Sequence, residues 1–222
     1  MTPPFALRTL RCYNPSMPVP DLEDAKMSAA ERARLGHELA RSRRYLEFGM
    51  GGSSLMAVRA GIGEMVSIDS DPAWVEAVKS HPEIAPRAAD GSIALLHADI
   101  GPVTDWGRPA DRTGLRKWSA YISAGWGEWA RRGALPDLVF VDGRFRVACC
   151  LSVAVVCANL PPEQFPRLLM HDVDDKRAYY RDALELFEAA ETVDTLLVMR
   201  PRGDKPAALA LTRLLERQFD FT

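Results

Sequence analysis

The sequence lacks the features that would tie it to a membrane or to a polyanion. Its longest nearly apolar run extends only from Val147 to Leu160 and is interrupted by Ser152 and Asn159, which is too short to span a bilayer and is typical of a buried helix. With 28 basic and 30 acidic residues the net charge is −2, so no excess of positive charge favours nucleic acid or an anionic membrane. We therefore expect a soluble protein with neither a nucleic-acid nor a membrane partner.

Cysteine is scarce, and its spacing excludes the usual zinc sites. The four cysteines are Cys12, Cys149, Cys150 and Cys157, and no CxxC pair occurs. On a helix over 147–160, Cys150 and Cys157 would share a face but lie roughly 10 Å apart along the axis, too far for a disulfide. The beginning of the chain also lacks the apolar core of a signal peptide. We therefore interpret the cysteines as buried hydrophobic residues of a cytoplasmic protein.

Short apolar strands alternate with helices along most of the chain. A capping-box pattern at Ser28 and Glu31 opens the first helix, and Asp71-Pro72 is a typical start of another. Such strands, most of them followed by a helix, indicate an α/β fold with a doubly wound, mostly parallel sheet. The strands are expected at 44–48, 64–69, 92–97, 137–142, 167–171 and 193–199, and the helices at 28–42, 53–60, 73–79, 147–160, 178–188 and 207–217.

The chain length favours a single domain over residues 1–222. An irregular, proline-rich arm and a helix, residues 1–43, precede the first strand. Residues 100–135 are too long for an ordinary connection and contain four of the five tryptophans. We expect a helix around 115–123 in this segment and loops near the ligand end of the sheet. The segment is either a cap over a substrate, a separate hydrophobic cluster or a dimer contact.

Each of the first five strands ends on a glycine turn or an acid. These positions are Gly49-Met50-Gly51-Gly52, Asp69, Asp99, Asp142 and His171-Asp172. In an open parallel sheet, ligands bind beyond the carboxyl ends of the strands. A glycine turn before a helix brings backbone N–H groups close to a ligand, and an acid about 20 residues later can accept both ribose hydroxyls. A further acid could accept the amino group of adenine, so the pattern predicts an adenosine whose 5′ substituent lies at the glycines.

The glycine turn departs from two common nucleotide-binding motifs. A P-loop needs a lysine after its last glycine, and none follows Gly52. The dinucleotide fingerprint needs glycine where this chain has Ser54. Glu47 would repel a pyrophosphate but is tolerable beside an ammonium or sulfonium group. The turn therefore favours a ligand that carries positive charge.

Taken in order, these motifs resemble the class I S-adenosylmethionine-dependent methyltransferases. Residues 47–54 (EFGMGGSS) are similar to the first motif of that family, 66–69 (VSID) to its ribose-binding strand and 97–99 (HAD) to its adenine-side acid. Residues 137–146 and 169–172 resemble the fourth- and fifth-strand motifs of small-molecule O-methyltransferase-like members. Trp106-Gly-Arg-Pro109, with Tyr121 and Trp126, is similar to a feature of a bacterial subgroup without assigned substrates.

The resemblance implies a Rossmann-like methyltransferase fold and S-adenosylmethionine as the cofactor. Carried over residue by residue, it places Glu47, Gly49, Gly51 and Gly52 at the methionine part of the cofactor, Asp69 at the ribose and Asp99 at the adenine. Two local alternatives stay open. Asp69 could instead cap the helix that begins after Asp71, and Asp99 could cap the next turn.

The resemblance places the chemistry at Asp142, His171 and Asp172. In metal-dependent members the fourth-strand acid and an Asp-Asn pair bind a divalent ion, but here His171-Asp172 replaces that pair. A metal at Asp142 and Asp172 is therefore an alternative that we do not favour. Without a metal, His171 is either a general base or a strand-end histidine hydrogen-bonded within the fold. Arg144 and Arg146 would hold an anionic substrate or pair with nearby acids.

We therefore predict an S-adenosylmethionine-dependent methyltransferase that acts on an unidentified small-molecule acceptor. The alternative is a methyltransferase-like protein that binds the cofactor or a nucleoside without catalysis. An NAD-dependent oxidoreductase is disfavoured by Glu47 and Ser54. The family closes its sheet with an antiparallel seventh strand, for which only 219–222 remain after the helix at 207–217. We expect this strand to be short or missing, and the exposed sheet edge would favour a homodimer.

Overall fold

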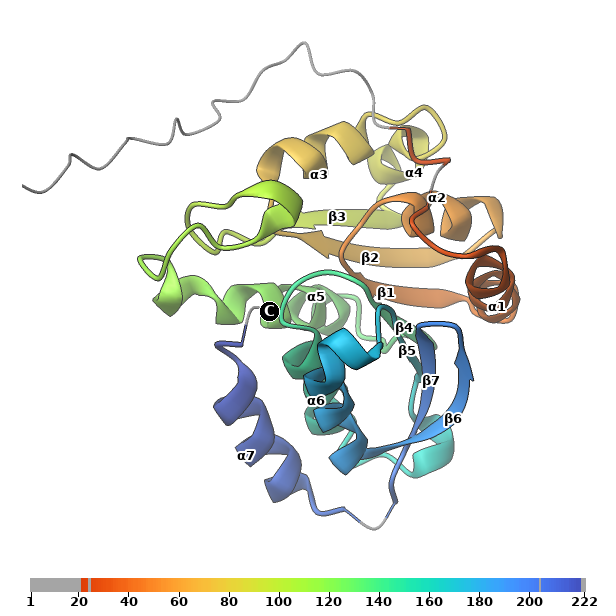
Figure 1. The fold of residues 1–222 in the computed structure, drawn as a ribbon. Coiled ribbons are helices and arrows are strands. Elements are labelled where there is room, and N and C mark those ends of the chain that lie inside the picture. Colours follow the sequence, from red (N-terminus) through yellow and green to blue (C-terminus); the bar gives the residue numbers. More distant parts are fainter. Residues whose placement is uncertain (1–20, 24, 204, 221–222) are drawn as a thin grey trace, which may run out of the picture.

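The computed structural model of the chain describes residues 21–23, 25–203 and 205–220. Seven strands form one sheet in the order β3-β2-β1-β4-β5-β7-β6 (Figure 1). The strands β1 to β5 pair in parallel, whereas β7 is antiparallel to both β5 and β6. The predicted doubly wound, mostly parallel sheet is confirmed. The strands are β1 (Arg44–Phe48), β2 (Glu64–Asp69), β3 (Ile93–His97), β4 (Leu138–Val141), β5 (Arg167–Met170), β6 (Phe187–Val193) and β7 (Leu196–Pro201).

Helices cover both faces of the sheet, and successive residues of β1 show how the two faces are divided. Tyr45 faces the cluster that includes Leu35 of α1 and Ala57 of α2, whereas Leu46 faces the larger cluster built with α5 and α6. The first face carries α1 (Ala29–Leu39), α2 (Gly52–Arg59), α3 (Pro72–Lys79) and α4 (Ala85–Ala89). The second carries α5 (Ser119–Arg131), α6 (Arg146–Val156), the 3₁₀ helix η4 (Asp175–Glu185) and α7 (Ala207–Arg217), which packs on α6 (Figure 1).

Local sequence signals set the starts of two helices as predicted. Ser28 caps α1, and the side chain of Glu31 accepts the Ser28 N–H in return, which completes the capping box. Asp71 caps α3 through hydrogen bonds from the N–H groups of Ala73 and Trp74, with Pro72 at the first helical position.

The C-terminal part of the sheet differs from the prediction. The strand expected at 193–199 is β7, and it is preceded by a strand, β6, that the sequence analysis missed. Of the β6 side chains only Phe187 is buried, so the strand lacks the apolar run by which the others were recognised. The helix expected at 178–188 is the 3₁₀ helix η4, which ends at Glu185. The expectation of a short or missing seventh strand is therefore wrong.

The tryptophan-rich segment contains the crossover between β3 and β4. Its helix, α5, is longer than the 115–123 expected and packs against β2 and β3. Trp118, Tyr121 and Trp129 are buried in the main core, whereas Trp106 is 78% exposed on a loop. The short 3₁₀ turns η1 (Asp105–Gly107) and η2 (Leu115–Lys117) lie before α5, and η3 (Pro162–Gln164) lies before β5. Most of the aromatic surface thus stabilises the fold itself.

The cysteines of α6 and its C-cap are buried thiols. Cys149, Cys150 and Cys157 are free, and burial raises the pKa of the Cys157 thiol to about 11, which keeps it protonated and unreactive at neutral pH. Cys12 lies outside the residues that the structure describes. No helix within the described ranges is long and apolar enough to cross a membrane.

Candidate functional site

The turns after β1 and β4 meet at the point where the strand order reverses. Gly49 has a φ of +97°, and a Cβ atom on it would lie 2.5 Å from the Cα of Gly143. The chain is held there by hydrogen bonds from the Gly49 N–H to the Ile68 carbonyl and from the Asp142 N–H to the Phe48 carbonyl, each 2.8 Å long. Only glycine fits both turns. Gly143 was missed by the sequence analysis, although the Asp142-Gly143 pair after a strand is a turn signal.

The rest of the glycine turn is held by its neighbours. The Gly51 N–H donates to Ser54 Oγ over 3.0 Å at the start of α2. Trp74 Nε1 donates to the Met50 carbonyl over 2.8 Å. A Cβ on Gly52 would lie 2.7 Å from the carbonyl oxygen of Leu22, so the chain before α1 packs against this glycine. Gly52 therefore serves close packing, while Gly49 and Gly51 shape the turn at the sheet edge.

Glu47 lies beneath the glycine turn and is fully buried. Its carboxylate accepts hydrogen bonds from Ser54 Oγ and Ser67 Oγ, both 2.5 Å long, and from the Tyr45 hydroxyl at 3.1 Å. Burial raises the pKa of Glu47 to about 7, and it outweighs the opposing effect of these hydroxyl donors and of Ser53. Glu47 therefore supports the turn from inside the fold, and its place beside the methionine part of the cofactor stays a prediction.

Asp69 ends β2, next to the glycine turn. Its Oδ1 accepts the N–H groups of Ser70 and Asp71 at 2.7 and 3.0 Å, and the described residues place no donor on Oδ2. Burial raises the pKa of Asp69 to about 6, although these two N–H groups oppose the shift. Asp71, not Asp69, caps α3. The carboxylate of Asp69 is thus fixed by one oxygen and presents the other.

A loop of the tryptophan-rich segment packs against this acid. Val103 and Pro109 form an antiparallel bridge at its base, and Ser70 Oγ donates to the carbonyl of Gly107 over 2.7 Å. A Cβ on Gly107 would lie 3.1 Å from Asp69 Oδ1. Trp106, at the tip, has a φ of +64°. The expected loop near the ligand end of the sheet is therefore present beside Asp69.

Asp99 follows β3, and both of its carboxylate oxygens are engaged by neighbouring residues. Its Oδ1 accepts the Gly101 N–H at 2.9 Å, and its Oδ2 pairs with Lys117 Nζ at 2.6 Å. The side chain is 58% exposed, and the hydrogen bond from Lys117 lowers its pKa. The capping alternative describes this conformation, and the predicted contact of Asp99 with adenine has no support from it.

The predicted catalytic residues lie together beyond β4 and β5. His171 Nδ1 is 3.1 Å from Asp142 Oδ1 and 4.0 Å from Asp172 Oδ1. Each of these three side chains offers one atom that could bind a metal ion, and these atoms all lie within 4.8 Å of one another. Asp142 and Asp172 are 26% and 31% exposed, whereas His171 is buried. The two acids are therefore the members of this group that a substrate can reach.

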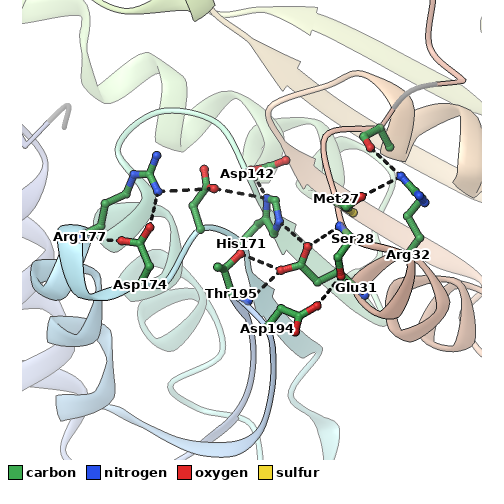
Figure 2. A network of polar contacts seen from close by, with 12 residues as sticks. Met27, Ser28, Glu31, Arg32, Asp142, His171, Asp174, Arg177, Asp194 and Thr195 are labelled. Atoms are coloured by element: carbon green, nitrogen blue, oxygen red, sulfur yellow. Dashed lines mark hydrogen bonds and ion pairs between the residues drawn. The ribbon is translucent and has the colours of Figure 1, made fainter.

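Glu31 on α1 completes this cluster and was missed as a site residue. Its Oε2 lies 3.2 Å from His171 Nε2 (Figure 2). Oε1 accepts the N–H and the hydroxyl of Thr195, at 2.8 and 2.7 Å, and Oε2 accepts the Ser28 N–H at 2.7 Å. Burial opposes ionisation, but these donors and His171 outweigh it and lower the pKa of Glu31 to about 2. The capping box located Glu31, but nothing local signalled a contact 140 residues along the chain.

His171 has a carboxylate at each ring nitrogen, Asp142 at Nδ1 and Glu31 at Nε2 (Figure 2). Burial disfavours its charged form, but the hydrogen bond and charge of Asp142, the charge of Asp172 and the hydrogen bond of Glu31 prevail, and its pKa is raised. Both ring nitrogens are therefore engaged by side chains of the fold. This geometry matches the alternative of a strand-end histidine hydrogen-bonded within the fold, while a role as general base stays a prediction.

Arg146, the first residue of α6, connects the same strand ends. Its Nη2 lies 3.1 Å from Asp142 Oδ1 and 2.9 Å from Asp172 Oδ2, and its Nη1 donates to the His171 carbonyl over 2.5 Å. The side chain is only 4% exposed. Of the two arginines considered from the sequence, Arg146 is therefore the one that pairs with the acids.

A cleft of about 450 Å³ lies away from these residues, between α6, η4 and α7. Its charged walls are paired with one another, Arg213 with Glu185 and Arg217 with Asp182. It contains none of the residues predicted from the sequence, so we place the functional site at the sheet edge.

No protein-family model and no curated protein sequence matches the chain. Among solved structures, a methyltransferase-like protein from Silicibacter pomeroyi is 28% identical with a TM-score of 0.68, over 88% of this chain and 96% of that one. An O-methyltransferase from Bacillus cereus, in complex with SAH, is 13% identical with a TM-score of 0.49, over 82% and 84% of the two chains. The O-methyltransferase TomG from Streptomyces achromogenes, in complex with SAM, is 20% identical with a TM-score of 0.44, over 80% and 82%. The strand order and the first of these structures confirm the resemblance: the chain has the fold of the class I S-adenosylmethionine-dependent methyltransferases.

Proposed function

We propose that this chain transfers a methyl group from S-adenosylmethionine to a small nucleophilic acceptor. The observation that carries the proposal is the contact of Gly49 with Gly143 at the reversal of strand order, with Asp69 on one side and the Asp142 cluster on the other. Ligands of open α/β sheets bind at this reversal point. The arrangement gives one side of the edge to a nucleoside and the other to an acceptor.

The residues on the β1–β2 side fit the nucleoside. The turn of Gly49 and Gly51 presents backbone without side chains to the amino-acid end of the cofactor. Asp69 Oδ2 would accept from the ribose, while Oδ1 is held by two N–H groups. The Trp106–Gly107 loop beside Asp69 would cover the nucleoside from outside. Glu47 holds Ser54, and Ser54 in turn holds the Gly51 N–H, so the buried acid keeps the turn in place.

The residues on the β4–β5 side would receive the acceptor. When bound, the cofactor supplies an electrophilic methyl group on a sulfonium sulfur. The acceptor must lose a proton and lie in line with that methyl group. Asp142 and Asp172 are the partly exposed bases here, and His171 and Arg146 fix their carboxylates from behind. We assign proton removal to one of these two acids.

The nature of the acceptor and the cellular setting follow from weaker signals. We expect a small molecule rather than nucleic acid because the net charge is −2, and a cytoplasmic location from the buried free thiols. We expected a homodimer because a missing seventh strand would expose the sheet edge. Since β6 and β7 complete the sheet, that reason no longer applies. Light scattering at several concentrations would measure the assembly state.

Calorimetric titration with S-adenosylmethionine, S-adenosylhomocysteine and NAD tests the proposal. We expect the first two to bind and Asp69→Asn to weaken them by about 1–3 kcal/mol, because a charged acceptor is lost. Asp90→Asn, an exposed turn residue at the amino end of β3, is the matched control and should leave the affinity unchanged. Absence of binding to the wild-type protein would overturn the proposal. Binding without methyl transfer to any of a broad acceptor panel would favour the non-catalytic alternative.

A further inference from the structure

The cluster beyond β4 and β5 contains a cation of its own. Arg146 uses all three nitrogens of its guanidinium group on the two strand ends. Nε donates to the Gly143 carbonyl over 3.0 Å, and Nη2 donates to the Asp142 carbonyl over 3.0 Å in addition to its two carboxylate contacts. Its Cζ lies 5.3 Å from the centre of the Tyr180 ring. This is a buried, fully engaged side chain rather than a mobile surface arginine.

The two acids that a metal would need are already bound to donors. Asp142 Oδ1 accepts from both Arg146 Nη2 and His171 Nδ1, each at 3.1 Å. Asp172 Oδ2 pairs with Arg146 at 2.9 Å, and Asp172 Oδ1 lies 3.6 Å from Arg177 Nη1. A divalent ion on these oxygens would have to displace the buried guanidinium group. An arginine left there without its partners would be a buried, unpaired charge and strongly destabilising.

The histidine of the cluster is also engaged by side chains of the fold. His171 Nδ1 lies 3.1 Å from Asp142 Oδ1, and its Nε2 lies 3.2 Å from Glu31 Oε2. Coordination of an ion through Nδ1 would break the contact with Asp142.

Arginines already supply positive charge to these acids. Arg146 pairs with Asp142 and Asp172, while Arg177 lies 3.0 Å from Asp174 and 3.6 Å from Asp172. A divalent ion would add two positive charges beside the buried Arg146 guanidinium group, which is electrostatically unfavourable. The residues present therefore do not fit a magnesium or calcium site.

We propose that the Arg146 guanidinium group takes the place of a divalent cation at the ends of β4 and β5, so that the site positions its acids without metal. The catalytic role of Arg146 rests on the proposed methyl transfer, whereas its ion pairs with Asp142 and Asp172 do not. In this chain Arg146 is a positioning residue, whose Nη2 atom contacts both Asp142 and Asp172 and holds the two carboxylates in place for the acceptor.

Binding of Mn²⁺, followed by electron paramagnetic resonance, tests this inference directly. We expect no saturable site in the wild-type protein, because carboxylate ligands that suit Mn²⁺ are held by Arg146. Arg146→Ala should create a site, which the double variant Arg146→Ala/Asp142→Asn should lose. Arg59→Ala removes the same charge from a surface ion pair with Glu23 and is the matched control, for which no site should appear.

The outcomes separate cleanly. Saturable Mn²⁺ binding by the wild-type protein that disappears in Asp142→Asn would overturn the inference, and so would a folded Arg146→Ala variant that gains no site. If Arg146→Ala fails to fold by circular dichroism, the wild-type titration decides alone: no site supports the inference, and a site dependent on Asp142 refutes it. None of these readouts uses the nucleoside, so failure of the proposed methyl transfer is detected separately, by calorimetry with S-adenosylhomocysteine.

Discussion

Replacement of Glu31 by glutamine should destabilise the protein strongly, although the residue lies on the N-terminal helix. Its carboxylate receives donors from three separate parts of the chain: Ser28, Thr195 and His171 (Figure 2). Glutamine has nearly the same shape, but its amide nitrogen cannot accept a hydrogen bond from any of them. The substitution thus removes one charge and leaves at least one buried donor without an acceptor.

The magnitude follows from the pKa of Glu31. A carboxyl group whose pKa falls from 4.5 in the unfolded chain to about 2 in the folded one stabilises the fold by about 3 kcal/mol at neutral pH. Since the folded pKa is the lower one, this contribution is complete above pH 4.5 and is lost as the pH falls toward 2. About half of it remains near pH ~3.3. Glu31→Gln should therefore cost about 3 kcal/mol at pH 7 and progressively less below pH 4.5.

Urea denaturation followed by tryptophan fluorescence, at several pH values between 3.5 and 8, measures this difference. Glu188→Gln on the exposed side of β6 is the matched control, and its stability should follow that of the wild type throughout. A difference between Glu31→Gln and wild type below 1 kcal/mol at pH 7 would refute the reasoning. So would a difference that stays constant as the pH falls, because it would show that the charge of Glu31 is not what matters.

Three further outcomes test other parts of the structure. The pKa of His171, measured by NMR, should lie above its usual value of about 6.5 and fall in Asp142→Asn, so the stability that its protonation provides is lost as the pH rises above 6.5. Glu47→Gln should gain stability relative to wild type as the pH rises from 4.5 through 7, by about 3 kcal/mol at most, because the folded pKa of Glu47 is raised; a trend of opposite sign in urea melts would contradict its burial. Gly49→Ala should destabilise the protein by more than about 2 kcal/mol in thermal melts and abolish cofactor binding. Gly36→Ala, which has open space on α1, is the control and should stabilise the protein by about 0.5–1 kcal/mol. Equal effects of the two substitutions would show that the turn does not require glycine at position 49.

The parts of the fold that were predicted from sequence are those whose signals are local. β1 and β2 have the expected bounds because they are short, apolar and buried on both faces. The start of α3 follows from Asp71-Pro72 in the same way. In contrast, β6 is exposed over most of its length and is held by pairing with β7, which its own sequence does not reveal.

The sequence predicted those site residues that directly follow a strand, but it missed those that join the site through long-range side-chain contacts. The topology brings Asp142, His171 and Asp172 to neighbouring strand ends, as their place after predicted strands indicated. The partner of His171 on α1 depends on how the N-terminal helix docks beside the turn between β6 and β7, through Glu31 and Thr195. No spacing rule connects residues so far apart in the chain.

Glu47 and Glu31 are buried acids on the two sides of this sheet edge, and their pKa values are shifted in opposite directions. Among the described residues, Glu47 has only hydroxyl donors. Burial therefore raises its pKa to about 7, and it can become neutral without losing its hydrogen bonds. Glu31 is held by hydrogen bonds from Ser28, Thr195 and His171, which outweigh its burial, so its pKa falls to about 2 and it stays charged. The glycine turn therefore rests on a support whose charge can change near neutral pH, whereas the acceptor side rests on fixed ion pairs. Binding a cation such as a sulfonium above Glu47 should favour its ionised form, so cofactor binding should release protons near pH 7. The same titration in buffers of different ionisation enthalpy measures that release, and Glu47→Gln should abolish it.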